Sequence, residues 1–517
     1  MNFRRPRSLA TVLSRLARLI DARPGCFLPL WILAYWVIVI PSARRPLWYD
    51  ELHTYYIATA PTLGRLLESS LHADLNPPLS YLAVRGSVAL FGDSPLSVRL
   101  PFLMAFLAAG LAMYEIVRPR FGGGYALLAL GLSWSCGFLP YAVEARPYAL
   151  ALAFFSLAAL GWLRAIAAER WGPAHWVLLT GLAGMLLSHC FAPLFAMAIG
   201  IGEIVRSIVQ KRIDARIWRA LLTPAIVALA YVPLIRNARG AIAPPALRAS
   251  ALSLVWIYPS ILMALGPFLL LMLLGALIMP RPQGAAGLRR LIYRHEAAFG
   301  MATLLVPALL ILYFIGAGGA FAPRYVSGVV LGVTLALTTL VAYKADRAPG
   351  FGVLAATLVL ARFLVSGAYL TPAVPSPAAS TIYRSIRADL PFVAANGFTF
   401  LEMDHREAPG FVRRLYYLSD PAAAFRYTHT NVFNGLIELP RWFPMRAHVL
   451  PYAAFVQDQR RFLVFSTPGY PADWLLAKLN HDGAEIRLLA EMKTSYRDGN
   501  LYEVTMCGAI PPGAAGK

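Results

Sequence analysis

The stretch CFLPLWILAYWVIVI, residues 26–40, decides the fold class because none of its side chains is charged. A helix needs about 20 largely apolar residues to cross the hydrocarbon core of a bilayer. Similar runs recur from Gly25 almost to Leu370, and the 517-residue chain is 58% hydrophobic and 14% charged. Soluble domains average about 25% charged residues. The sequence therefore predicts a polytopic α-helical membrane protein.

Further apolar runs follow the first one, and together they predict about eleven transmembrane helices. The later spans are expected near 97–117, 124–140, 147–164, 174–189, 190–208, 219–235, 254–279, 298–316, 325–343 and 350–370.

Residues 1–23 hold six arginines and a single acid, Asp21, which predicts a cytoplasmic arm containing a short amphipathic helix. A secretory signal peptide begins in a similar way. However, no small-x-small cleavage site follows the apolar run, and Arg44 and Arg45 come directly after it. An uncleaved first span is the favoured interpretation.

Basic residues are spread between the apolar runs and are not gathered on one domain, so the formal net charge of +21 does not indicate nucleic-acid binding. With the N-terminal arm inside, the loops 118–120, 206–219 and 289–294 are cytoplasmic, and they carry more Lys and Arg than the opposite loops. An odd number of spans then places the C-terminal region in the periplasm. The expected location of the protein is a bacterial inner (plasma) membrane.

The composition changes near Thr371, which predicts two domains, a transmembrane domain over 1–370 and a small α/β periplasmic domain over 371–517. The linker is Pro372–Pro377, PAVPSP. Within the second domain, the patterns predict strands over 398–403 and 461–467 and a helix over 472–479. Its charged cluster 404–407, DHRE, is expected to be a solvated loop.

The predicted first periplasmic loop, residues 41–98, contains three motifs in a fixed order. It begins with LWYDELH (47–53), continues with HADLNPPL (72–79) and ends with FGDSPLSVRLP (91–101) at the head of the next span. Taken alone, the pair Asp50–Glu51 behind a Trp-Tyr pair is also typical of an interfacial belt followed by a solvated turn.

The ordered set resembles the GT-C class of glycosyltransferases, whose members include protein O-mannosyltransferases and lipid A aminoarabinose transferases. The next outward loop, YAVEARPYAL (141–150), resembles the second acidic motif of that class. LSHCF (187–191) resembles a His-aromatic feature of bacterial members, with Cys190 where Tyr is common. FAPRY (321–325) resembles an Arg-Tyr pair associated with the donor phosphate.

The resemblance implies an integral-membrane enzyme that transfers a sugar from a polyprenyl-phosphate donor to an acceptor hydroxyl on the periplasmic side. Asp50 matches the first acidic position and is expected to be the general base, with Glu51 and Glu144 as further catalytic-site residues that shape acceptor or phosphate binding. Direct attack by the hydroxyl would invert the anomeric carbon. The residues expected to bind the donor phosphate or substrate are Arg146, Arg324, Tyr325, His53, His72, Asn76 and His189.

No His or Cys spacing in the sequence predicts a metal site or another cofactor, although carboxylates beside a phosphate would allow a divalent cation. The expected partners are the polyprenyl-linked donor, membrane lipids and an acceptor that is a lipid, a glycan or a protein. The motifs do not distinguish among sugars or acceptors.

Two other classes of function share parts of this pattern. A transporter or flippase for a lipid-linked sugar would have similar spans and arginines, but transporters tend to place ionisable groups near the bilayer midplane. Here the acids gather at one face. A membrane-anchored binding or assembly protein would work through the C-terminal domain, in which no catalytic pattern is evident.

Overall fold

The computed structural model describes residues 9–74, 76–232, 245, 248–278, 292–370, 389–493 and 498–507. Several predicted features lie outside these residues, namely the linker 372–377, the first eight residues of the arm, part of the loop 289–294 (289–291) and the ends of two predicted spans (233–235 and 279). Leu75 of the second loop motif is also outside them.

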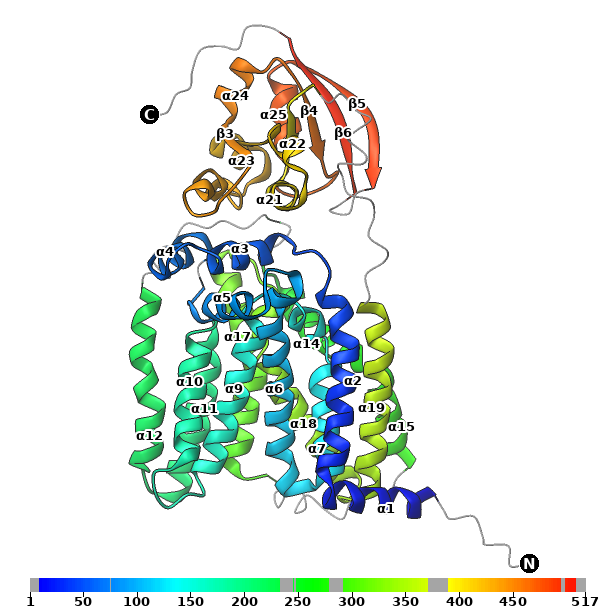
Figure 1. Cartoon of the computed structure of the whole chain (residues 1–517). Coiled ribbons are helices and arrows are strands. Elements are labelled where there is room, and N and C mark those ends of the chain that lie inside the picture. Colours follow the sequence, from blue (N-terminus) through cyan, green and yellow to red (C-terminus); the bar gives the residue numbers. More distant parts are fainter. Residues whose placement is uncertain are drawn as a thin grey trace, which may run out of the picture.

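Apolar helices form an upright bundle that makes up the body of the molecule (Figure 1). The helices are α2 (Pro24–Ala43), α6 (Pro95–Phe121), α7 (Gly123–Ser135), α9 (Tyr148–Ala165), α10 (Pro173–Leu186), α11 (Ala192–Gln210), α12 (Ala215–Leu222) with the 3-10 helix Thr223–Ala230, α14 (Ala251–Leu262), α15 (Gly266–Ile278), α17 (Arg294–Ala317), α18 (Val329–Lys344) and α19 (Pro349–Leu370).

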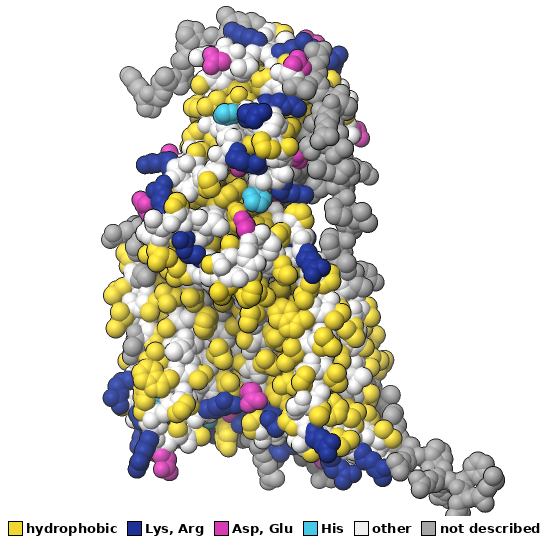
Figure 2. All heavy atoms as spheres, in the orientation of Figure 1, with side chains coloured by type: hydrophobic (Ala, Val, Ile, Leu, Met, Phe, Trp, Pro, Cys, Tyr) yellow, Lys and Arg dark blue, Asp and Glu magenta, His cyan; other side chains and the backbone are white. Residues whose placement is uncertain are grey.

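Within the described residues, seven helical segments are long and apolar enough to cross a membrane. Shorter apolar helices, among them α10 and α18, stand beside them. The helices of the bundle overlap the predicted spans, and apolar side chains cover the bundle's visible outer face (Figure 2). The prediction of a multi-pass helical membrane protein is confirmed, while the number of crossings stays a prediction.

The two ends of the bundle differ. At one end, the helix α1 (Leu9–Ala22) lies across the bundle, and Asp21 accepts a hydrogen bond of 2.6 Å from the Gly123 amide (Figure 1). We call this the α1 end. At the other end lie α3 (Tyr49–Ala58), α4 (Leu63–Ser69), a π-helical turn (Ser70–Asp74) and α5 (Leu79–Phe91), with the C-terminal domain above them. We call this the loop end.

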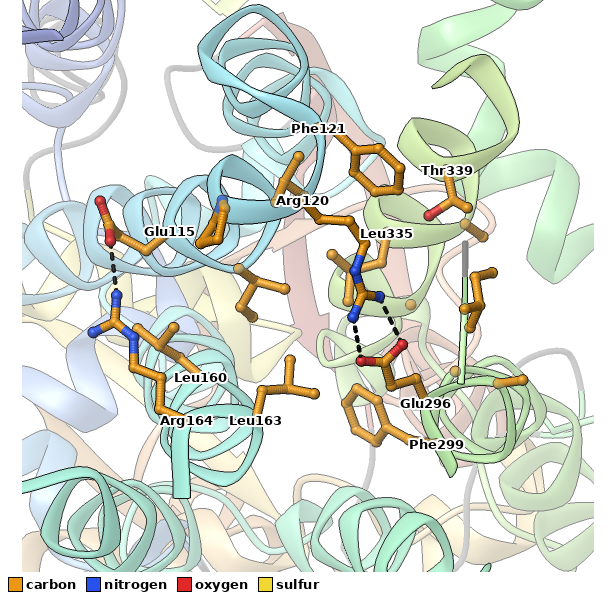
Figure 3. Close-up of a pocket in the computed structure, with 18 of the residues that line it drawn as sticks. Glu115, Arg120, Phe121, Leu160, Leu163, Arg164, Glu296, Phe299, Leu335 and Thr339 are labelled. Atoms are coloured by element: carbon orange, nitrogen blue, oxygen red, sulfur yellow. Dashed lines mark hydrogen bonds and ion pairs between the residues drawn. The ribbon is translucent and has the colours of Figure 1, made fainter. Parts of the chain in front are cut away.

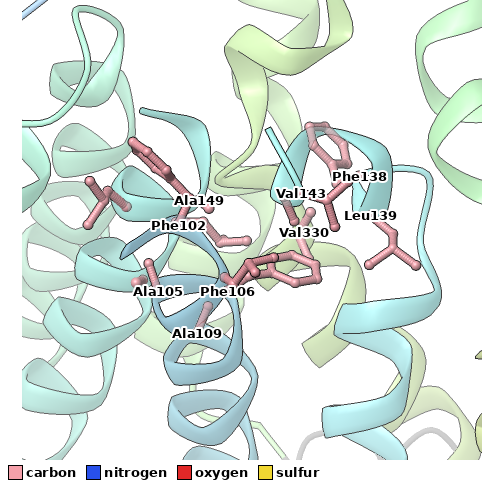
Figure 4. Packing of buried hydrophobic residues seen from close by; sticks show 14 of the residues in the cluster. Phe102, Ala105, Phe106, Ala109, Phe138, Leu139, Val143, Ala149 and Val330 are labelled. Carbon is pink, nitrogen blue, oxygen red and sulfur yellow. The ribbon is translucent and has the colours of Figure 1, made fainter. Parts of the chain in front are cut away.

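Close packing holds the bundle together. A Cβ atom on Gly161 would lie 2.4 Å from the Leu178 backbone nitrogen, and one on Gly181 would lie 2.5 Å from that of Ala158, so α9 and α10 approach closely because these positions lack side chains. At the loop end, Phe138 and Val143 pack over Phe102 and Phe106 of α6 (Figure 4). This packing anchors the segment that carries Glu144 and Arg146.

The C-terminal domain contains a six-stranded sheet in the order β3-β2-β1-β4-β6-β5. Strands β3, β2, β1 and β4 are parallel to one another, and Phe392 lies opposite both Leu415 and Leu463. Strand β6 is antiparallel to both of its neighbours, β4 and β5. The strands are β1 (Phe392–Ala394), β2 (Leu415–Ser419), β3 (His448–Pro451), β4 (Arg461–Ser466), β5 (Ala484–Lys493) and β6 (Asp498–Met506). The helices are α21 (Gly397–Arg406), α22 (Pro409–Val412), α23 (Pro421–Thr428), α24 (Tyr452–Asp458) and α25 (Leu475–His481), with a 3-10 helix at Asn434–Arg441.

The small sheet domain confirms the predicted class, and β4 and α25 match the strand and helix predicted at 461–467 and 472–479. The strand predicted over 398–403 is wrong, because these residues form α21. Asn396 caps this helix by accepting a hydrogen bond of 2.9 Å from the Thr399 amide. Local β-propensity at Phe398 and Phe400 is overridden by this cap and by burial of the helix.

The cluster 404–407 is not a solvated loop, and this expectation is also wrong. Asp404 is fully buried at the end of α21, and its Oδ1 accepts hydrogen bonds from the amides of Arg446 (2.9 Å) and Ala447 (2.7 Å). Glu407 is buried as well. Backbone donors satisfy the Asp404 carboxylate, which explains why a charged group is tolerated inside the domain.

Candidate active site at the loop end

The first turn of α3 carries the two adjacent acids of the first motif, and the fold gives them different surroundings. Acidic side chains are favoured at a helix N-terminus, where unpaired amides and the helix dipole attract negative charge. Glu51 is fully buried, and its Oε2 accepts a hydrogen bond of 3.1 Å from the Trp48 amide. Asp50 remains partly open, with 17% of its side chain exposed.

Glu51 is held by a buried ion pair with Arg99, whose side chain is also fully buried. The Arg99 Nε donates to Glu51 Oε1 at 2.7 Å and a terminal nitrogen lies 2.5 Å from Oε2. The same guanidinium donates to the carbonyls of Ala43 (2.8 Å) and Pro46 (3.0 Å). Glu51 Oε1 also accepts from the Ala145 amide at 2.8 Å. This pair therefore joins the end of α2, the start of α3, α6 and the second acidic motif.

A second buried pair links Arg146 to Asp74. The two terminal nitrogens of Arg146 donate to Asp74 at 2.6 and 2.9 Å in a bidentate arrangement. Arg146 also donates to the Asp50 carbonyl at 3.0 Å, and the Tyr81 hydroxyl donates to Asp74 at 2.7 Å. Asp74 and Arg99 were not among the residues singled out from the sequence, although both lie inside the quoted motifs.

Arg324 provides the third arginine and pairs with Asp50, at 3.1 Å between Nη2 and Oδ2. Its guanidinium carbon lies 5.9 Å from the ring centroids of Trp48, Tyr148 and Tyr325, which is within the range of cation–π attraction. One quarter of the Arg324 side chain is exposed. Asp50 and Arg324 are thus the most accessible members of the three pairs, since the other two pairs are at most one-tenth exposed.

Glu144 lies in the same cluster and has an unusual protonation equilibrium. Burial, followed by the nearby negative charge of Glu51, raises the pKa of the Glu144 carboxyl to about 7, against the opposing charges of Arg324 and Arg45. Its Oε2 is buried and has no hydrogen-bond partner in the structure. Near neutral pH this carboxyl is therefore poised between its acidic and basic forms, as a group that exchanges protons requires.

Two histidines beside these residues are held in the neutral form. Burial lowers the pKa of His53, and it lowers the pKa of His189 to about 3, where the charge of Arg146 acts in the same direction. His53 Nδ1 lies 3.1 Å from the Ala73 carbonyl, so Nδ1 carries the proton and Nε2 is an acceptor. His189 Nδ1 accepts from the Phe191 amide at 3.2 Å, which leaves the proton on Nε2.

The structure brings most of the predicted site residues together at the loop end, but His72 lies apart. Its ring stacks on Trp442 of the C-terminal domain, with centroids 4.9 Å apart, and its Nδ1 bonds to the Glu68 carbonyl. Asn76 follows Asp74 closely and donates to its carbonyl at 3.3 Å. Tyr325 joins His189 and Phe191 in an aromatic group beside Arg324.

Several buried polar atoms in this cluster lack a hydrogen-bond partner in the structure. Buried polar atoms are nearly always hydrogen-bonded in folded proteins, so those that lack partners mark places where a ligand or water binds. Buried atoms without a partner in the structure include three donors and three acceptors around Asp50: Trp48 Nε1, Arg146 Nε, Arg324 Nε, His53 Nε2, Asn76 Oδ1 and Glu144 Oε2. A ligand that both donates and accepts hydrogen bonds and carries negative charge would satisfy them.

The C-terminal domain closes one side of the cluster. The Glu402 Oε1 of α21 accepts a hydrogen bond of 3.1 Å from the Tyr49 amide, next to Asp50. The Tyr49 ring packs edge-on against Phe398 at 4.5 Å, and His53 packs against Phe443 at 5.2 Å. Within the described residues, no group of three or more His, Cys, Asp or Glu side chains is placed to hold a metal ion.

Comparisons with known proteins agree with this geometry. Residues 75–236 match the family model for dolichyl-phosphate-mannose-protein mannosyltransferase. The fold is similar to the crystal structure of ArnT from Cupriavidus metallidurans in the apo state, with a TM-score of 0.55 and 14% sequence identity over 93% of this chain and 98% of that chain. The structure of the same protein bound to undecaprenyl phosphate matches with a TM-score of 0.55, 13% identity and the same coverage.

No curated protein matches the sequence significantly. The family match includes residues 75–79 of the second loop motif, the third motif and the segment with Glu144, Arg146 and His189. The fold likeness spans 93% of the chain. Together they confirm the resemblance to GT-C glycosyltransferases that the motifs indicated.

Proposed function

We propose that this protein transfers a sugar from a polyprenyl-phosphate-linked donor to an acceptor hydroxyl, at the loop end of the bundle. The observation that carries the proposal is the Asp50–Arg324 pair, a partly open acid and base surrounded by unpartnered polar atoms. The ArnT structure with undecaprenyl phosphate supports a polyprenyl-linked donor. The site lies at one end of the bundle (Figure 1), where the phosphate of a lipid with its chain in the bilayer would also lie.

Arg324 is our candidate for the donor phosphate. The leaving phosphate gains negative charge as the glycosidic bond breaks, and a guanidinium can bind two of its oxygens at once. Arg146 is already bound to Asp74 through both terminal nitrogens. We therefore assign it the role of positioning Asp50, whose carbonyl it also binds. Its Nε is the one nitrogen of the guanidinium that has no partner in the structure. The neutral His53 and His189 then supply one acceptor and one donor for hydroxyls.

Asp50 is our candidate for the general base. Deprotonation of the acceptor hydroxyl by a carboxylate contributes typically about 10²–10⁴ in rate. Glu51 is not suited to this step because Arg99 and two backbone amides bind it in a buried site, so we propose that it positions Asp50. Glu144, which is protonated in part at neutral pH, would donate a hydrogen bond to the bound phosphate or sugar. Direct displacement inverts the anomeric centre.

The distribution of charge supports an assignment of the two ends to sides of the membrane. Lys and Arg side chains gather at the α1 end of the bundle (Figure 2). In the sequence, Arg118 and Arg164 lie in the last turns of α6 and α9, Lys211 follows α11 and Arg216 lies at the start of α12. Because basic loops stay in the cytoplasm, we propose that the loop end and the C-terminal domain face the periplasm. This orientation places Asp50, Glu144 and Arg324 on the outer leaflet of an inner membrane.

A transport assay separates this proposal from a flippase. The full-length protein would be reconstituted into vesicles with polyprenyl-phosphate mannose or polyprenyl-phosphate aminoarabinose, each labelled in the sugar, together with an extract of envelope lipids and proteins as acceptors. We expect label to move from the polyprenyl lipid to an acceptor. Movement of intact labelled lipid between leaflets without transfer, for both sugars, would contradict the proposed function and indicate a flippase.

A further inference from the structure

A cavity of about 740 Å³ lies between four helices at the α1 end. Its lining comes from the end of α6, the end of α9, the start of α17 and the middle of α18. Arg99 at the active site and Arg120 at the cavity lie on the same helix, 21 residues apart, which corresponds to roughly 30 Å at 1.5 Å per residue. The cavity is therefore separate from the proposed active site.

The cavity has an apolar interior and a charged rim. Leu160, Leu163, Phe299 and Leu335 form part of its wall. Its volume lies within the range of about 300–1,000 Å³ that is usual for small-molecule sites. Because the four helices belong to a membrane-embedded bundle, the hydrophobic ligand with the readiest access to such a wall is the acyl chain of a lipid.

Two ion pairs stand at the rim (Figure 3). Arg120 of α6 binds Glu296 of α17 through two hydrogen bonds of 2.7 and 2.8 Å. Arg164 of α9 binds Glu115 of α6 at 2.7 Å. Three of these four side chains are at least 36% exposed, and Glu296 is 13% exposed. At least one partner of each pair is exposed and screened by solvent, so ligand groups of opposite charge can exchange with these pairs.

Among the described residues, the charges that line the cavity are balanced, with two arginines and two glutamates. An anionic headgroup would satisfy the arginines but repel the glutamates, whereas a headgroup that carries both charges satisfies all four. We propose that this cavity binds a phospholipid with a zwitterionic headgroup, of the phosphatidylethanolamine class. The arginines take the phosphate, the glutamates take the ammonium group, and an acyl chain enters the apolar interior.

A glycine on the cavity wall allows the interior to be blocked. Gly300 of α17 lines the cavity, and a Cβ atom there would meet no atom within 4 Å. The Cβ of Gly300→Leu therefore lies in open space, and the added side chain takes up room at the cavity wall. Gly316 lies on the same helix, is equally open at Cβ and is not part of the lining, so Gly316→Leu is the matched control.

Native mass spectrometry of the full-length protein in detergent tests the proposal with dioleoyl phosphatidylethanolamine and dioleoyl phosphatidylglycerol as probes. We expect the wild type and Gly316→Leu to retain one phosphatidylethanolamine in preference to phosphatidylglycerol. Gly300→Leu should bind it at least about tenfold more weakly, a loss of about 1.4 kcal/mol. Equal retention by Gly300→Leu, or wild-type binding of phosphatidylglycerol that is as tight, would overturn the proposal.

A second variant keeps the test decisive if Gly300→Leu does not fold. Glu115→Lys leaves the apolar wall intact and reverses one exposed charge at the rim, where Arg118 lies 4.0 Å from Glu115. We expect this variant to bind phosphatidylglycerol more tightly than phosphatidylethanolamine. An unchanged preference would show that the rim charges do not select the headgroup, and the proposed site would be wrong.

Discussion

Both ends of the helix bundle hold arginine–carboxylate pairs, and an exposed pair at the α1 end contrasts with two buried pairs at the loop end. At the α1 end, Arg164–Glu115 joins neighbouring helices and about half of each side chain is exposed. At the loop end, Arg99–Glu51 and Arg146–Asp74 are buried and join segments far apart in the chain. Buried charge is costly unless it is fully paired. In the cluster around Asp50, the two buried pairs are therefore rigid, and the Asp50–Arg324 pair is more accessible than either of them.

Removing one partner of a buried pair should show this difference most strongly. Arg99→Ala leaves the Glu51 carboxylate buried without its counter-charge, and we expect it to lower the free energy of unfolding by about 3–5 kcal/mol. Arg164→Ala at the α1 end is the control, with an expected loss of about 0–1 kcal/mol. The measurement is denaturant unfolding in mixed micelles. Equal losses for the two variants would remove the contrast between the ends.

Arg324 should matter for the reaction and little for the fold. Arg324→Ala removes the proposed phosphate ligand, and we expect kcat for sugar transfer to fall by about 10²–10³. Its unfolding midpoint should stay close to that of the wild type because the side chain is one-quarter exposed and makes a single ion pair in the structure. Arg65→Ala, at an exposed loop-end arginine paired with Glu68, is the control and should keep full activity. A large loss of stability with unchanged activity would reverse the assigned role.

The contact from the C-terminal domain should have a smaller effect. Glu402 accepts a hydrogen bond from the Tyr49 amide in the first turn of α3, where carboxylates stabilise a helix by about 1 kcal/mol. We expect Glu402→Gln to lower kcat about fivefold while KM changes less, because Asp50 is held less firmly. Glu438→Gln, at an exposed acid of the same domain, should be silent. If both variants behave alike, the domain does not position α3.

Glu144 should give the smallest and most specific effect. Its pKa of about 7 lies above the value of 4.5 for an ordinary glutamate, so the protonated form stabilises the folded protein. That stabilisation is fully present below pH 4.5 and is lost as the pH rises through 7. Glu144→Gln cannot ionise and should not show this loss of stability at high pH. We therefore expect the Tm difference, variant minus wild type, to increase by about 1–2 °C between pH 5 and pH 8. A constant difference across this range would place the Glu144 pKa elsewhere.

Much of the fold was predictable because the membrane imposes a simple pattern. Long apolar runs such as α2 and α6 need no tertiary information. The ordered loop motifs also indicated correctly that the segments around Asp50 and Glu144 lie at one end of the bundle. Their proximity follows from the alternating direction of successive spans, which is a topological argument and needs no side-chain detail.

The separate surroundings of Asp50 and Glu51 were not predictable from the sequence. The two residues are adjacent in the sequence. Glu51 is bound by Arg99 of α6, which lies 48 residues later in the chain, whereas Asp50 remains accessible. Asp74 was overlooked for the same reason, because its partner Arg146 is 72 residues away. The prediction of a strand at 398–403 was wrong because the local pattern does not show that Gly397 packs against Phe433 and Leu436.

The central claim is that Asp50 is the base of a transfer reaction, and Asp50→Asn tests it most directly. Asp93→Asn is the control, since Asp93 is an acid of the same loop whose contact with the Tyr55 hydroxyl, at 2.6 Å, is exposed. With a labelled polyprenyl-phosphate sugar, we predict that Asp50→Asn lowers kcat for transfer by about 10²–10⁴ while Asp93→Asn keeps the wild-type rate. Transfer by Asp50→Asn at the full rate would contradict the claim.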